Sequence, residues 1–329
     1  MKILAVDDDP TILELLTQFV EVVGGHELVT AMSGAEALQL AQSSGQAGFD
    51  CFLFDIQMPE MDGIELTQSI RTIAQHASTP ILMLTAMSDK RYIDAAFAAG
   101  ATDYVTKPFE VTELTARLRL VEDLVNMRQV KTKKIFATQS LSVHDQPITA
   151  SETIELHDPV SIYDVENVIE YSAMENYVRQ LARGSMFGSA AFAFTVRKIE
   201  EHHNVMSAAE FSFLISDVAE VISDTLVGHQ FLMAYAGSGT FICVTESGWR
   251  PDMVALMDGV NLSLSRTELY DNSGQQLFVR VSAGDSIRLI WKSENTVMDS
   301  ICAAYLSAEA ASAAHEASMN DLWMAPKRA

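Results

Sequence analysis

The sequence predicts an α/β protein of two domains, in which a doubly wound, five-stranded parallel sheet is followed by a second α/β domain of ferredoxin-like kind. The length of 329 residues suits two domains, at roughly 100–200 residues each. Short apolar runs alternate with helical patterns through the first part of the chain. After a polar stretch, a second series of strands and helices contains a hairpin signal, Gly237-Ser238-Gly239, between two apolar runs.

In the first domain, short apolar runs predict the strands, and 3.6-residue periodicity predicts the helices between them. The expected strands are 2–6, 27–30, 51–54, 81–85 and 103–105, and the expected helices are 11–23, 34–41, 64–74, 90–99 and 110–127. Strands that read as continuous apolar runs are covered on both faces, which indicates a parallel sheet. A ligand site is then expected where the carboxyl ends of the strands meet.

The last of these helices carries apolar residues at spacings of three and four, at Val111, Leu114, Leu118, Val121 and Val125. Such a seam either packs on the helix's own sheet or forms a two-stranded contact with another helix. Beyond this seam the helical pattern fades. The segment from about Ile135 to Pro159 is rich in Ser, Thr, Gln and Pro and shows no hydrophobic periodicity. We therefore expect a first domain at 1–126 and a helical extension and linker at 127–160.

The second domain is expected over 161–309, with a loose tail at 310–329. The expected strands are 190–196, 230–235, 240–245 and 277–282, and the expected helices are 165–182, 208–226, 252–264 and 293–308. Two helices precede the hairpin, and a helix and a strand follow it, which favours a ferredoxin-like sandwich.

Composition excludes several classes of function. The net charge is −22, with 22 Lys plus Arg against 44 Asp plus Glu, and this excess of acid argues against binding DNA or an anionic membrane. Three scattered cysteines give neither a disulfide framework nor a thiolate zinc site. No stretch approaches the roughly 20 apolar residues that span a bilayer, and no signal peptide is recognisable. A cytoplasmic protein is expected.

Polar side chains follow the predicted strands of the first domain at the edge where the ligand site is expected. Asp7 and Asp8 end the first strand, Asp55 the third and Thr85 the fourth, and Lys107 follows the fifth. Carboxylate oxygens with room for water and a phosphate suit Mg²⁺. A hydroxyl, an ammonium and one carboxylate nucleophile beside that ion fit phosphoryl transfer to Asp55.

Residues 1–125 resemble the receiver domain of two-component response regulators. The resemblance is carried by Val6-Asp7-Asp8-Asp9-Pro10, Asp55-Ile56-Gln57-Met58-Pro59, Leu84-Thr85-Ala86 and Lys107-Pro108-Phe109. It implies that a histidine kinase or phosphotransfer protein phosphorylates Asp55. It further implies that Asp7, Asp8, Asp55 and the Gln57 carbonyl hold Mg²⁺, and that Thr85 and Lys107 bind the phosphoryl oxygens. Thr85 and Tyr104 would form the conformational switch.

Residues 235–241 resemble the signature hairpin of the GGDEF, or diguanylate cyclase, family, and the resemblance extends over about 158–308. Its hairpin residues here are Gly237, Ser238, Gly239, Thr240 and Phe241. The family's acidic pair corresponds to Gly239 and Thr240, and its first-strand metal acid to Thr195. Neutral side chains do not hold the two metal ions of the cyclase reaction. A degenerate, catalytically inactive domain is therefore expected.

The sequence thus predicts a response regulator that acts by binding an unidentified downstream protein. Apart from phosphoryl transfer to and from Asp55, no enzyme activity is expected. A homodimer through the Val111–Val125 seam stays open. So does nucleotide sensing, because Gly237 and Gly239 leave room for a phosphate of GTP or cyclic-di-GMP to approach the turn. Residual diguanylate cyclase activity is the remaining alternative.

Overall fold

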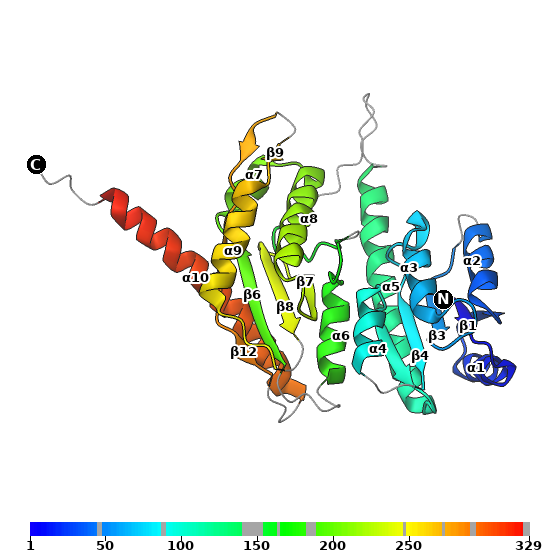
Figure 1. Ribbon diagram of the computed structural model, residues 1–329. Coiled ribbons are helices and arrows are strands. Elements are labelled where there is room, and N and C mark those ends of the chain that lie inside the picture. The colour runs from blue at the N-terminus through cyan, green and yellow to red at the C-terminus, as the bar shows by residue number, and fades with distance from the viewer. Residues whose placement is uncertain are drawn as a thin grey trace, which may run out of the picture. The chain divides into compact units, whose positions relative to one another are not determined.

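A computed structural model describes residues 1–44, 48–86, 90–139, 154–162, 165–181, 189–245, 248–271, 274–289 and 294–324, without the side chains of 127–139, 181, 294–296 and 319–324. The chain divides into two compact units, Met1–Pro147 and Ile148–Ala329. Each unit has its own sheet and its own core (Figure 1).

The first unit contains the predicted parallel sheet of five strands. These are β1 (Lys2–Val6), β2 (Glu27–Ala31), β3 (Cys51–Asp55), β4 (Ile81–Thr85) and β5 (Asp103–Thr106). Every neighbouring pair is parallel, in the order β2-β1-β3-β4-β5. Both faces of β1, β3 and β4 are buried, which explains why these strands read as unbroken apolar runs.

Five helices cover the two faces of this sheet. They are α1 (Pro10–Val23), α2 (Gly34–Ser43), α3 (Gly63–Arg71), α4 (Lys90–Ala98) and α5 (Val111–Gln139), with a 3-10 turn at Ala74–His76. α1 and α5 bury their apolar stripes on one face, and α2, α3 and α4 on the other. Local signals begin the helices: the side chains of Asp9, Ser33 and Asp62 cap α1, α2 and α3.

The seam on α5 packs on the helix's own sheet. Leu114, Leu118, Val121 and Val125 are all buried within the first unit, and only Val111 at the start of the helix is exposed. A two-stranded contact through this seam is therefore wrong, because its apolar surface is already covered. A homodimer through it loses its support.

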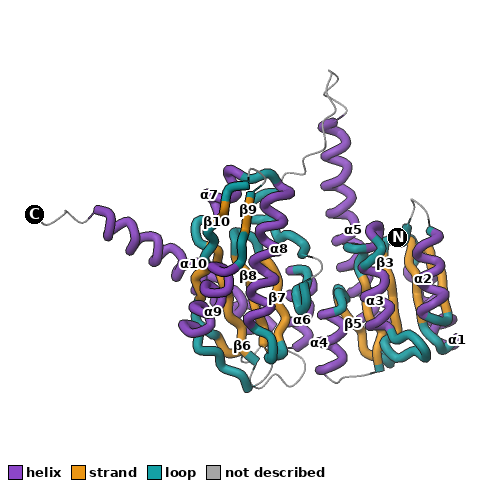
Figure 2. The backbone as a smooth tube through the Cα atoms, turned by 45° about the horizontal axis from the view of Figure 1, so that its top comes forward, coloured by secondary structure: helices purple, strands orange, loops and turns teal. Residues whose placement is uncertain are grey.

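The second unit is built on an antiparallel sheet in the order β11-β6-β8-β7, with β12 paired to β6 (Figure 2). The strands are β6 (Ala190–Val196), β7 (Phe231–Tyr235), β8 (Thr240–Thr245), β11 (Val281–Ala283) and β12 (Ile287–Arg288). A small separate pair is formed by β9 (Leu269–Tyr270) and β10 (Gln276–Leu277). Strand, helices, hairpin, helix and strand succeed one another as in a split βαβ unit, as the sequence predicted.

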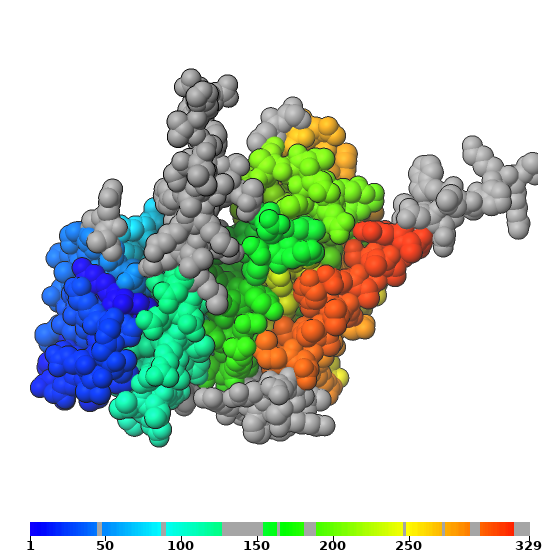
Figure 3. Space-filling model, turned by 180° about the vertical axis from the view of Figure 1, so that it is seen from behind, coloured from blue at the N-terminus to red at the C-terminus, as the bar shows by residue number. Residues whose placement is uncertain are grey.

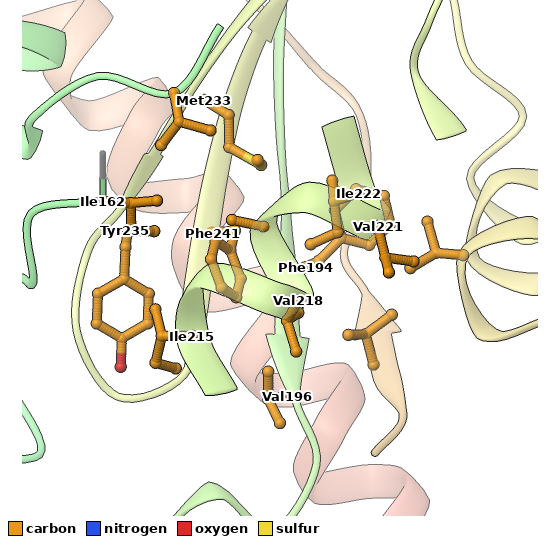
Figure 4. Packing of buried hydrophobic residues seen from close by; sticks show 14 of the residues in the cluster. Ile162, Phe194, Val196, Ile215, Val218, Val221, Ile222, Met233, Tyr235 and Phe241 are labelled. Carbon is orange, nitrogen blue, oxygen red and sulfur yellow. The ribbon is translucent and has the colours of Figure 1, made fainter. Parts of the chain in front are cut away.

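Helices cover both faces of the second sheet. They are α6 (Tyr171–Leu181), α7 (Ile199–Val205), α8 (Ala208–Thr225), α9 (Met253–Arg266) and α10 (Glu294–Met324). Phe194 and Val196 of β6 point toward Ile215 and Val218 of α8 (Figure 4). α6 and α10 contact each other and the sheet (Figure 3). Because successive residues of a strand face opposite sides of the sheet, the residues immediately before and after Phe194 face α6 and α10.

Four sequence predictions need correction. The expected tail at 310–329 is helical to Met324, because an Ala-rich segment with buried Ser312 continues α10. The expected strand 277–282 is split, since β10 pairs with β9 and β11 with β6. The expected helix 165–182 begins only at Tyr171, and Val168 bridges to Met233 of β7 instead. The expected linker ends early, because Ile154 and Leu156 already pack on the second core.

Within the described residues, no helix combines the length and the apolar character needed to cross a membrane.

His76 makes the stability of the first unit depend on pH. Its buried ring meets Phe52 edge-on at 5.1 Å, and burial lowers the pKa of this imidazole below its usual value of 6.5. The unfolded chain then takes up a proton before the folded one, so the free energy of unfolding falls as pH drops below about 6.5. We expect His76→Gln to lose this part of the pH dependence. Urea unfolding of the wild type and of His76→Gln, followed by hydrogen exchange of β3 between about pH 7.5 and about pH 5.5, checks this across the titration range of histidine. If the slope of stability against pH is unchanged by the substitution, the argument is contradicted.

Candidate functional site

The carboxylates of the first unit converge at the point where the strand order reverses. In the order β2-β1-β3-β4-β5, the crevice between β1 and β3 is the topological switch point of the sheet. Val6 lies beside Phe54 in the register, so the residues that follow them, Asp7 and Asp55, come together. Oxygen atoms of Asp7, Asp8 and Asp55 lie within 4.8 Å of one another.

Lys107 connects two of these carboxylates. Its ammonium group lies 2.6 Å from Asp7 Oδ2 and 2.9 Å from Asp55 Oδ1. The Asp7 and Asp55 side chains are 1% and 7% exposed, so water screens these contacts weakly. The backbone N–H of Lys107 donates to the Thr85 carbonyl at 2.6 Å, which fixes the start of the lysine side chain at the end of β4.

Burial and charge shift the proton affinities of this group in opposite ways. Burial raises the pKa of the Asp55 carboxyl, and the hydrogen bond and charge of Lys107 offset part of that rise. For Lys107, burial acts to lower the pKa, but the hydrogen bonds and charges of Asp7 and Asp55 outweigh it and the pKa is raised. The raised pKa keeps the Lys107 ammonium group protonated, and its charge opposes the effect of burial at Asp55 in favour of the ionised form that a nucleophile needs.

Backbone geometry around the carboxylates shows two supporting residues that the search for chemical side chains missed. A Cβ on Gly63 would lie 2.1 Å from the Asp55 carbonyl oxygen, so only glycine allows α3 to begin against the end of β3. The Asp9 N–H donates to Asp7 Oδ1 at 3.0 Å and orients that carboxylate. The Asp62-Gly63 pair was visible in the sequence, but its role depends on a contact with Asp55.

Thr85 and Tyr104 lie near each other on one face of the sheet. Tyr104 pairs with Met83 and Thr85 with Thr106, and because side chains alternate, Met83, Thr85 and Tyr104 share a face. Thr85 is fully buried, whereas Tyr104 is half-buried with its ring edge-on to Phe97 at 6.3 Å. Gln57 is exposed two residues beyond Asp55. These positions are compatible with the expected switch and with the expected carbonyl ligand.

The donor set suits a hard divalent cation. Three carboxylates offer only oxygen atoms, and Asp8 is exposed whereas Asp7 and Asp55 are buried, which leaves one side open to water and phosphate. Mg²⁺ prefers such a site, with few protein oxygens and several waters. Asp7, Asp8 and Asp55 would hold the ion beside Lys107.

In the second unit, two hydroxyl groups face each other between neighbouring strands β6 and β8. Thr195 of β6 pairs with Thr240 of β8, and their Oγ1 atoms lie 2.9 Å apart in a buried position. The Tyr305 hydroxyl of α10 lies near Glu309, Ser238 and Thr240, and burial together with Glu309 raises its pKa. Glu309 is thus one acid at this end of the hairpin. Elsewhere than at Asp7, Asp8 and Asp55, the described part of the chain brings no three metal-ligating side chains together.

The turn of the hairpin is covered by the segment 154–158, which we call the strap. The Ser238 N–H donates to the Leu156 carbonyl at 2.7 Å, and the Ser238 hydroxyl bonds to the His157 ring at 2.7 Å. A Cβ on Gly237 would lie 2.3 Å from the His157 carbonyl oxygen, and one on Gly239 would lie 2.9 Å from Ile199. The expectation that these glycines leave room for a phosphate is therefore wrong, because the chain itself fills that room.

Removing the Lys107 charge is expected to destabilise the first unit. Lys107→Met leaves two buried carboxylates unpaired, which costs about 3 kcal/mol at neutral pH, and the loss shrinks as acid protonates them. Mg²⁺ should restore part of it by binding the folded state. Urea unfolding read by hydrogen exchange of β1 and β3 measures this. The control Lys90→Met removes a partly exposed pair with Asp94, worth about 0.5 kcal/mol; equal losses in the two variants would contradict the argument.

Comparison with known proteins identifies the first unit. Residues 3–119 match the family model of the response regulator receiver domain. The transcriptional regulatory protein SrrA of Staphylococcus aureus is 38% identical over 118 residues, 36% of this chain and 46% of SrrA. The chain thus spans about half the length of the curated relatives that it matches.

Among solved structures, the chemotaxis protein CheY4 of Vibrio cholerae is 37% identical, with a TM-score of 0.34, and covers 36% of this chain and 97% of its own. A putative response regulator from Chloroflexus aurantiacus is 38% identical, with a TM-score of 0.34, and the match covers 36% of this chain and 95% of that structure's chain. The family match over the residues that carry the acidic site decides the identity: the amino-terminal unit of this chain is a response regulator receiver domain.

Proposed function

We propose that the chain is a phosphorylation-dependent response regulator of a two-component pathway. A histidine kinase or phosphotransfer protein donates the phosphoryl group to Asp55, and the second unit delivers the output by binding a downstream protein. The observation that supports this most directly is the bridge from Lys107 to both Asp7 and Asp55 at the switch point of the sheet.

The chain's own residues provide positioning and charge for this transfer. An Asp55 carboxylate oxygen forms the new bond to phosphorus as the bond from phosphorus to the donor histidine nitrogen breaks. Mg²⁺, when bound by Asp7, Asp8 and Asp55, neutralises charge on the phosphoryl oxygens. Lys107 supplies a fixed positive charge, and the Thr85 hydroxyl at the end of β4 donates to the new acyl phosphate. Movement of Thr85 toward the phosphate would open space for the Tyr104 ring.

For the second unit, we infer a degenerate GGDEF-type domain without cyclase activity. The split βαβ order, the β7–β8 hairpin and its Gly-Ser-Gly-Thr-Phe sequence support the assignment. The bond between Thr195 and Thr240 supports inactivity, because two neutral hydroxyls replace the carboxylates needed to hold metal ions near a triphosphate. What remains is a folded surface suited to binding a protein.

Two other outputs are less well supported. Nucleotide sensing at the hairpin requires the strap to leave Gly237, where it now makes hydrogen bonds to Ser238. A transcriptional output, which the name of the relative SrrA suggests for that protein, requires contacts with phosphates that a net charge of −22 opposes. Calorimetry with GTP tests the first alternative, since micromolar binding would favour it over protein binding.

Acetyl phosphate and Mg²⁺ are expected to label the wild-type chain once and to leave Asp55→Asn unlabelled. The substitution keeps the shape of the side chain but removes the nucleophilic carboxylate. Asp123→Asn, at an exposed position of α5, is the charge-matched control and should label like the wild type. Phosphate-affinity electrophoresis and intact mass measure the label. Equal labelling of Asp55→Asn would refute Asp55 as the acceptor.

Incubation of the full chain with GTP and Mg²⁺ or Mn²⁺ is expected to yield no cyclic dinucleotide, with or without acetyl phosphate. Liquid chromatography with mass detection reads the product. Any turnover that Thr240→Val abolishes would show that the hairpin retains catalysis, and the proposed output would then be wrong.

A further inference from the structure

Two arginines lie opposite each other where β6 and β11 leave the second sheet. Val196 pairs with Val281, so Arg197 and Arg280 are the next pair of this antiparallel ladder, and the Arg197 N–H donates to the Arg280 carbonyl at 2.9 Å. Phe194 and Val196 face the core beneath α8 (Figure 4), so alternation directs Arg197 to the face that α10 covers. Like charges directly opposite each other destabilise a sheet.

The Arg197 guanidinium is held in place by neutral groups. Its Nε donates to the Ser282 hydroxyl at 2.9 Å, and its Nη1 bonds to His315 Nε2 of α10 at 2.7 Å. Since guanidinium has no acceptor, His315 accepts through Nε2, and this contact keeps its ring neutral. Among the described residues, the remaining nitrogen, Nη2, contacts the Met257 sulfur at 4.0 Å, a weak acceptor, so it keeps donor capacity for an oxygen.

Within the part of the chain that the structure describes, neither arginine forms an ion pair with a carboxylate. Among the described residues, none has a carboxylate oxygen within 4.0 Å of a nitrogen of Arg197 or Arg280, although the chain carries 44 acids. Glu316, beside His315, accepts instead from the Lys198 N–H at 3.2 Å. Burial and the charge of Arg280 lower the pKa of Arg197, and burial and both arginines lower the pKa of His315. The charge of Glu316 acts on His315 in the opposite direction and offsets only part of this effect.

We propose that Arg197, Arg280 and His315 form a binding site for a small oxyanion, the phosphate or carboxylate group of a ligand. A guanidinium offers paired N–H groups that match two oxygens of such an anion. Arg280 is exposed, and Arg197 and His315 are half-buried, so an anion can reach the group from solvent and still meet preplaced donors. The ligand would tie the ends of β6 and β11 to α10. This site adjoins the turn of the hairpin, since the N–H of Val196, the residue before Arg197, donates to the Gly239 carbonyl at 2.8 Å, and it does not depend on Asp55.

A purely structural role makes a different prediction. If Arg197 serves only to fasten α10 to the end of β6, its bonds to Ser282 and His315 are sufficient and Arg280 contributes nothing to binding. The exposed Arg280 therefore decides between the two roles, and its replacement should leave the fold intact.

The test is calorimetry of the full chain, in metal-free Tris buffer without a phosphoryl donor, with pyrophosphate, inorganic phosphate and citrate as separate probes. We expect pyrophosphate to bind with a millimolar or tighter Kd, and Arg280→Gln and Arg197→Gln each to weaken it by about tenfold. Arg266→Gln, an exposed arginine at the end of α9, changes the net charge equally and should bind within about twofold of the wild type. Binding of citrate without binding of pyrophosphate would identify a carboxylate ligand.

Nuclear magnetic resonance of His315 gives a second readout, because its ring signals should shift with the same Kd. The proposal is overturned if none of the three anions binds at about 10 mM, or if Arg266→Gln weakens binding as much as Arg280→Gln does. Labelling of Asp55 by acetyl phosphate is measured separately, so loss of anion binding and failure of the phosphoryl acceptor are distinguishable.

Discussion

The contact of one ammonium group with two buried carboxylates is the interaction on which the first unit depends. Asp7 and Asp55 would repel each other at the closed end of the crevice, and desolvation alone would favour their protonated forms. Lys107 reaches both because β5 ends beside β4 and its following residue bonds back to the Thr85 carbonyl. A hydrophobic sheet thereby presents ionised oxygens at one edge. Sheet order, and not any single motif, creates this arrangement.

In the second unit, neutral hydroxyl groups occupy the buried position beside the hairpin turn. Thr195 and Thr240 satisfy each other, which avoids the desolvation penalty that buried unpaired polar groups incur. The strap supplies hydrogen-bond partners for Ser238 at the turn. Burial of the turn by its own chain leaves little access for a triphosphate.

The two units therefore use charge differently within one acidic chain. In the first, carboxylates gather around a lysine and a prospective cation. In the second, two arginines and a histidine gather at the edge where β6, β11 and α10 meet, and no carboxylate of the described residues pairs with either arginine. Since like charges in proximity raise the free energy of the fold, each cluster is most simply understood as complementary to an ion of the opposite sign.

The sequence by itself determined the parallel sheet of the first unit and the acidic residues at its edge. Period, strand length and the positions of Asp7, Asp55 and Lys107 are local information, and β1 and β4 were predicted to the residue. The same local signals gave the β7–β8 hairpin and the order of the split βαβ unit, because glycines and apolar runs mark turns and strands without reference to distant contacts.

Only the tertiary structure decided how distant segments meet. The α5 seam could face its own sheet or another helix, and burial of Leu114, Leu118 and Val121 settled that choice. The sequence suggested open space at Gly237, whereas the structure places the strap against it. The role of Gly63 depends on its contact with the Asp55 carbonyl. Arg197, Arg280 and His315 lie far apart in the chain, and no period relates them. Contacts of this kind depend on packing across the whole unit, which local pattern does not encode.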